Sequence, residues 1–131
     1  MRFSIFGYYG QGNAGDEAIL SALIDGIKQR FVSADIGVYT ASVLETERNY
    51  KVKGLRFFGI DPMSLIRGVL MADRLLYVKS VIHFFRSDVI LIGGGGLFVD
   101  SPETNEWIYG YINLIHRAKR FGKGCSYGYK R

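Results

Sequence analysis

The stretch 3-FSIFGYYGQGNAGDEAIL-20 joins a short apolar run, a glycine-rich turn and the start of an amphipathic segment. The apolar run ends at Gly7 and is typical of a buried β-strand. Between Asp16 and Phe31 the apolar residues recur with helical spacing, and acids in the first turn and bases in the last suit the helix dipole. The stretch therefore predicts a strand, a turn and a helix in succession.

The same alternation continues along the chain. Further strands are predicted at Asp35–Thr40, Leu55–Phe58 and Asp88–Ile92, and further helices at Leu44–Tyr50, Pro62–Phe85 (in two pieces) and Trp107–Phe121. Strands that alternate with helices indicate an α/β fold, here a Rossmann-like, doubly wound parallel sheet in one domain covering 1–131. The last segment, Gly124–Arg131, has the composition of a poor strand.

Composition excludes several classes of protein. With 48% hydrophobic and 22% charged residues the chain resembles a folded domain rather than a disordered one, and its single cysteine cannot form an internal disulfide. Neither a signal peptide nor an apolar run of membrane-spanning length is present, so we expect a cytoplasmic protein. The net charge of +5 suits anionic partners, but the scattered basic residues do not favour nucleic acid. His83, His116 and Cys125 lack metal-ligand spacing, and we expect no metal site.

Two glycine-rich turns follow the first and fourth predicted strands, at Gly10–Glu17 and Gly93–Asp100. In a doubly wound sheet these strands are usually neighbours, at the point where the strand order reverses, and ligands bind at their carboxyl ends. We therefore expect the two turns to lie side by side and to form one pocket.

The first turn matches the dinucleotide fingerprint G-x-G-x-x-G, with its glycines at positions 10, 12 and 15. A nicotinamide site also needs an acid at the end of the second strand, where this chain has Thr40-Ala41-Ser42. Asp35 lies at the wrong end of that strand, and Asp16 and Glu17 would repel a pyrophosphate. We therefore expect no nicotinamide cofactor, and no other cofactor is predicted.

The two turns together resemble the motifs of polysaccharide pyruvyl transferases. The first is Gly7 to Leu20 with the core Asn13-Ala14-Gly15-Asp16, and the second is the strand and glycine turn from Asp88 to Asp100. The resemblance extends from Met1 to about Gly122. It implies the N-terminal domain of a two-domain architecture like that of B-type glycosyltransferases, and transfer of pyruvate from phosphoenolpyruvate to sugar hydroxyls as a ketal.

The resemblance implies that the acceptor, a cell-surface polysaccharide or its lipid-linked precursor, binds at these turns. Asp16 and Asp100 are the candidate catalytic residues, because the reaction needs a base for the sugar hydroxyl. The candidate substrate-binding residues are Gly10, Gly12, Asn13, Gly15, Glu17, Gly93, Gly94, Gly95 and Gly96. Asp16 and Glu17 could equally be first-turn helix charges, and Asn13 could be a helix cap.

Phosphoenolpyruvate is expected to bind mainly to a second domain, since the turns contain no cluster of Lys or Arg. The family continues into such a domain, and the chain is expected to be a truncated form that is inactive alone. Two other classes remain open at this point. One is half of a glycosyltransferase of similar architecture, and the other is a non-catalytic binding module.

The segment from Leu75 to Phe85 is strongly apolar and is accompanied by Arg67, Arg74, Lys79 and Arg86. It is interpreted either as a helix packed on the sheet or as an interfacial patch that holds the protein at anionic lipid on the inner membrane face.

Overall fold

The computed structural model describes residues 1–7, 9–57, 74–93 and 124–128, together with the single positions 63, 66, 70, 113, 116, 119 and 120. The described strands are β1 (Arg2–Phe6), β2 (Asp35–Tyr39), β3 (Lys53–Leu55), β4 (Val89–Gly93) and β5 (Gly124–Gly128). The described helices are α1 (Ala14–Arg30), α2 (Val43–Tyr50) and α4 (Arg74–Arg86).

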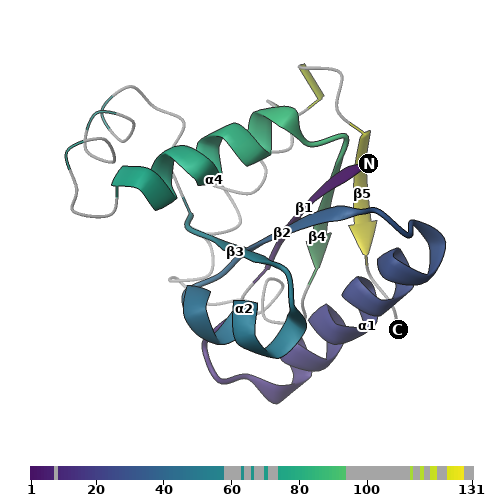
Figure 1. The fold of residues 1–131 in the computed structure, drawn as a ribbon. Helices are drawn as coiled ribbons and strands as arrows, with labels where there is room; N and C mark the ends of the chain where they lie inside the picture. The colour runs from purple at the N-terminus through teal and green to yellow at the C-terminus, as the bar shows by residue number, and fades with distance from the viewer. Residues whose placement is uncertain are drawn as a thin grey trace.

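The strands form one sheet in the order β3-β2-β1-β4-β5, and every pair is parallel. The chain leaves β3 at one side of the sheet and returns as β4 beside the first strand, so the strand order reverses between β1 and β4 (Figure 1). This topology confirms the predicted Rossmann-like α/β fold and the predicted adjacency of the first and fourth strands.

The expectation of a poor strand near the C-terminus was wrong. Residues Gly124–Gly128 form β5, which pairs with β4 in the register Val89↔Gly124 to Gly93↔Gly128. The composition misled because a strand at the side of a sheet is held by backbone hydrogen bonds to its neighbour, which any side chain permits.

Three other predicted elements need correction or fall partly outside the described residues. The third strand is Lys53–Leu55 rather than Leu55–Phe58, because its pairing with β2 starts at Gly37↔Lys53. Of the predicted helix Pro62–Phe85, the structure describes α4 and the helical positions 63, 66 and 70. Of the predicted helix Trp107–Phe121 it describes the helical positions 113, 116, 119 and 120, and the remainder lies outside the described residues.

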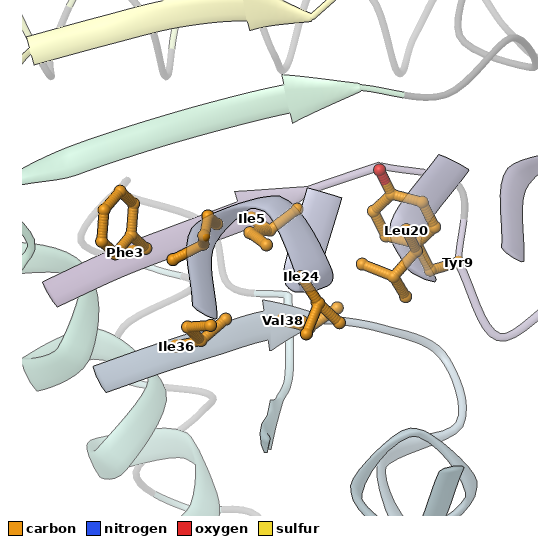
Figure 2. Packing of buried hydrophobic residues seen from close by; sticks show 8 residues of the cluster. Phe3, Ile5, Tyr9, Leu20, Ile24, Ile36 and Val38 are labelled. Atoms are coloured by element: carbon orange, nitrogen blue, oxygen red, sulfur yellow. The ribbon is translucent and has the colours of Figure 1, made fainter. Parts of the chain in front are cut away.

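One face of the sheet carries an aliphatic core beneath α1. Figure 2 shows side chains from α1 lying over β1 and β2. Tyr9, from the turn that follows β1, lies at the end of the cluster. The buried members are Phe3, Ile5, Tyr9, Leu20, Ile24, Ile27, Ile36 and Val38. Burial of these apolar side chains fixes α1, and with it the glycine turn that leads into the helix. The second helix lies on the same face, where Tyr50 contacts α1 through hydrogen bonds with Glu17 and Lys28.

The opposite face is covered by α4, and its contact with the sheet is partly polar. His83 is buried and lies 2.9 Å from the carbonyl oxygen of Phe3, which requires Nε2 to be the donor. Tyr39 donates to the carbonyl of Ser80 at 2.6 Å. A Cβ on Gly37 would lie 2.5 Å from His83 Nε2, so this position admits only glycine if the imidazole is to reach the strand. No helix in the described part of the chain is long and apolar enough to span a membrane.

Burial lowers the pKa of His83, since it disfavours the charged imidazolium, and this outweighs the hydrogen bond to Phe3. The unfolded chain then binds more protons below the ordinary histidine pKa of about 6.5. We expect the urea midpoint of the protein to fall as the pH is lowered from 7.5 to 5. His83→Gln should lose this part of the acid sensitivity, whereas His116→Gln, at an exposed helical position, should keep it. An unchanged acid profile in His83→Gln would contradict the assignment.

Candidate functional site

The first glycine turn meets the end of β4 at the carboxyl edge of the sheet, where the strands end. Phe6 pairs with Ile92, and the hydroxyl of Tyr9 donates to the carbonyl of Gly93 at 3.0 Å. A Cβ on Gly7 would overlap that same carbonyl oxygen. The two strand ends that precede the glycine turns are therefore in direct contact, as predicted. The structure thus places Gly93 beside the first turn, while Gly94, Gly95, Gly96 and Asp100 lie outside the described residues.

The first turn has two glycines with backbone conformations that other residues rarely adopt. Gly10 has φ +77° and Gly12 has φ +76°. A Cβ on Gly10 would collide with the Thr40 hydroxyl and lie 2.6 Å from the Ser42 amide nitrogen, because the turn packs against the end of β2. A Cβ on Gly12 would meet open space. Gly10 is thus packed against the protein, whereas Gly12 is exposed on the rim of the turn.

Asn13 caps α1, which confirms one of its two predicted roles, the helix cap; the other is contact with the substrate. Its Oδ1 accepts a hydrogen bond from the amide of Gly15 at 3.0 Å, and its carbonyl accepts from the amide of Glu17 at 3.0 Å. The side chain is exposed, so a contact with a ligand at the same position stays a prediction.

Glu17 holds three elements together. Its Oε1 accepts from the amide of Gly10 at 2.8 Å, and its Oε2 accepts from the hydroxyl of Tyr50 in α2 at 2.6 Å. Burial and the bond to this carboxylate raise the pKa of Tyr50 to about 12. Both carboxylate oxygens therefore accept hydrogen bonds within the protein, and Glu17 links the first turn to α2.

These bonds change what the fingerprint-like turn can bind. In a dinucleotide site the amides of the turn and of the helix start face a pyrophosphate. Here the amide of Gly10 donates to Glu17, and that of Gly15 donates to Asn13. Two amides of the turn are thus paired with oxygen atoms of the chain itself, which argues against a pyrophosphate held by those two amides.

Asp35, the acid at the sequence distance of a ribose-binding residue, lies at the opposite edge of the sheet. Its carboxylate contacts Arg2 Nε and Lys53 Nζ, each at 2.8 Å. Burial acts to raise the pKa of Asp35, but the hydrogen bonds and charge of these two cations outweigh it and hold the pKa below its usual value. Asp35 therefore joins the starts of three strands and is remote from the glycine turns.

Asp16 is buried in the first turn of α1, with 2% of its surface exposed. A charge that merely complements the helix dipole is normally solvated, and aspartate is seldom fully buried. The burial of Asp16 thus argues against a simple surface charge. The predicted role of the Asp16 carboxylate as a catalytic base stays a prediction.

Comparison with known families bears on this site. The profile of the family described as polysaccharide pyruvyl transferase matches residues 13–128. The chain belongs to this family. The match starts at Asn13, so the core Asn13-Ala14-Gly15-Asp16 lies at its beginning, and it extends through β5. No curated protein and no solved structure matches the chain.

The sequence did not indicate a role for three polar residues at the carboxyl edge of the sheet, Thr40, Ser42 and Thr46. Thr40 is buried and accepts from Thr46 Oγ1 at 3.0 Å and from the Ser42 amide at 3.2 Å, which fixes the loop that supports Gly10. The only signal was the sequence Thr40-Ala41-Ser42 at a strand end. Tyr9 of the first turn is buried in the core. Among the described residues no cluster of His, Cys, Asp and Glu could hold a metal ion.

Alanine at the two positive-φ glycines should separate backbone strain from packing. Gly12→Ala should destabilise the protein by about 1–2 kcal/mol, the cost of a left-handed conformation with a Cβ. Gly10→Ala should cost about 1–3 kcal/mol more, because the new methyl also collides with the end of β2. Urea denaturation of both variants measures the difference. Equal losses would contradict the packing of the turn on β2.

Proposed function

We propose that this chain forms the acceptor-binding part of an enzyme that transfers pyruvate from phosphoenolpyruvate to a sugar as a ketal. The acceptor would be a cell-surface polysaccharide or its lipid-linked precursor. The observation that carries the proposal is the buried carboxylate of Asp16, which lies within the family match and follows the exposed residues Gly12 and Asn13 in the sequence.

The reaction sets the requirements for the site. One sugar hydroxyl bonds to the central carbon of phosphoenolpyruvate as the methylene carbon takes up a proton. The bond to phosphate then breaks, and a second hydroxyl adds to the same carbon to close the ketal. Of the two hydroxyl protons, one is balanced by the new methyl group and the other by the released phosphate. A base near the attacking hydroxyl and an acid near the methylene are needed.

Asp16 is proposed as the base that accepts the proton of the acceptor hydroxyl, and Asp100 as the second carboxylate of the site. Because Asp16 is buried, a hydroxyl would reach it after a local shift of the turn at Gly12, whose surroundings are open. Gly12, Asn13 and Gly15, which are exposed, would contact the sugar, and Glu17 would keep the turn in shape.

The donor is proposed to bind through other groups of the enzyme. The described residues of the first turn and of the loop after β2 (7, 9–17 and 40–42) contain no Lys or Arg, and a single described base, Arg56, follows the carboxyl end of β3. A trianionic donor needs several cationic or N–H contacts to leave water. A division in which this edge binds the acceptor and another part of the enzyme binds phosphoenolpyruvate satisfies both requirements.

Asp16→Asn tests the proposed base while keeping the size of the side chain. In the full-length enzyme we expect kcat to fall by about 10²–10⁴-fold, the usual range for loss of a general base. The KM for phosphoenolpyruvate should change much less, because the role is expressed mainly in the transition state. Phosphate release in the presence of a panel of nitrophenyl hexosides measures both constants. Asp25→Asn, an exposed acid of the same helix, is the matched control and should retain activity.

Two outcomes would count against the proposal. If Asp16→Asn folded normally and kept wild-type kcat, the carboxylate would be structural only. If no hexoside stimulated phosphate release from phosphoenolpyruvate by the wild-type enzyme, while a nucleotide sugar was consumed, the donor would be wrong. Circular dichroism and urea denaturation of each variant distinguish loss of catalysis from loss of folding.

A further inference from the structure

The outer face of α4 combines exposed apolar side chains with exposed cations. Leu75, Val78, Ile82 and Phe85 are 70%, 40%, 48% and 41% exposed, and their spacing of three and four residues places them along one stripe of the helix. The residues that pack on the sheet lie on the other side of the helix: Tyr77, Ser80, His83 and Phe84. Both sides of α4 are therefore apolar in part, although only one is buried.

The charges beside this stripe are all positive. Arg74, Lys79 and Arg86 are exposed, and α4 contains no acidic residue. With about 100° per residue, Lys79 and Arg86 flank one side of the stripe and Arg74 the other. An apolar stripe bordered by cations on both sides is the pattern of a helix that lies in the surface of an anionic membrane.

We propose that the outer face of α4, defined by these four apolar residues and three cations, binds the surface of an anionic lipid bilayer. The apolar side chains would enter the boundary of the acyl chains, while the cations would contact the lipid phosphates. This inference is independent of the proposed function, because it rests on the composition and exposure of α4 and on nothing at the glycine turns.

The charge pattern favours lipid over a second copy of the chain. Self-association through this face would bring Arg74, Lys79 and Arg86 close to the same residues of the other copy, and α4 offers no carboxylate to balance them. An anionic bilayer supplies the opposite charge to all three. Leu44 on α2 is also exposed, but that helix carries the acids Glu45 and Glu47 together with its single base, Arg48.

Vesicle co-sedimentation of the purified full-length protein tests the proposal. We expect binding to mixed phosphatidylcholine–phosphatidylglycerol vesicles, little binding to pure phosphatidylcholine, and release as salt is raised. Replacing Arg74, Lys79 and Arg86 by Gln should weaken binding roughly fivefold per cation, or roughly a hundredfold together. The matched control replaces three exposed cations elsewhere, Arg30, Arg48 and Lys51, by Gln, and should bind almost as the wild type does.

The apolar contribution has its own matched pair. Leu75→Ser should weaken vesicle binding by roughly tenfold, whereas Leu44→Ser, at a leucine of similar exposure (76%), should not. Three results would overturn the proposal: no binding to anionic vesicles, equal losses in both triple variants, or a dimer in sedimentation velocity that Leu75→Ser dissociates. The last result would assign the face to a second copy of the chain.

Discussion

The close approach of β1 and β4 at Gly7 and Gly93 is the constraint on which the site depends. A side chain at Gly7 would overlap the Gly93 carbonyl oxygen and the ring of Tyr9, so the chain can turn away from β1 here only as glycine. The same carbonyl accepts the Tyr9 hydroxyl, which anchors the turn to the neighbouring strand end. Because strand order reverses between these two strands, the anchored turn sits where open α/β sheets bind ligands.

Hydrogen bonds within the chain stabilise the rest of the turn. Glu17 accepts hydrogen bonds from the amide of Gly10 and the hydroxyl of Tyr50, and Asn13 accepts one from the amide of Gly15. The two edges of the sheet therefore differ in character. At the amino edge Asp35 is neutralised by Arg2 and Lys53, which ties strand starts together. At the carboxyl edge the described residues of the first turn contain no cation, and its carboxylates and the Thr40 hydroxyl are buried or bonded within the protein.

Much of the fold could be predicted from local pattern. The apolar run before Gly7 and the helical spacing after Asp16 each specify their own element, and their repetition specifies the parallel sheet. The membership of the chain in the polysaccharide pyruvyl transferase family was also accessible, because two motifs in order are more specific than one. The strand Gly124–Gly128 was missed because its pairing with β4 depends on long-range backbone bonds and not on apolar side chains.

The candidate site was less accessible to sequence reasoning, for the same physical reason. The pattern identified Asp16 and Glu17 as acids of one helical turn, with Asp16 as a candidate base and Glu17 as a candidate substrate-binding residue. In the structure Asp16 is buried, while Glu17 accepts bonds from a glycine seven residues earlier and from Tyr50 in another helix. Such partners follow from tertiary packing, which spacing along the chain does not encode. The ring of Tyr9 likewise belongs to the core beneath α1, a contact that its place in a glycine-rich turn does not indicate.

The central claim is that sugar hydroxyls bind at the carboxyl edge between β1 and β4. Amide chemical shifts of the isotope-labelled protein, recorded during titration with a nitrophenyl hexoside acceptor, test this claim most directly. We expect saturable shifts at Gly12, Asn13 and Gly15, with Arg2 and Asp35 at the opposite edge unaffected. Saturable shifts confined to the amino edge, or shifts of the turn produced by a dinucleotide and not by any hexoside, would contradict it.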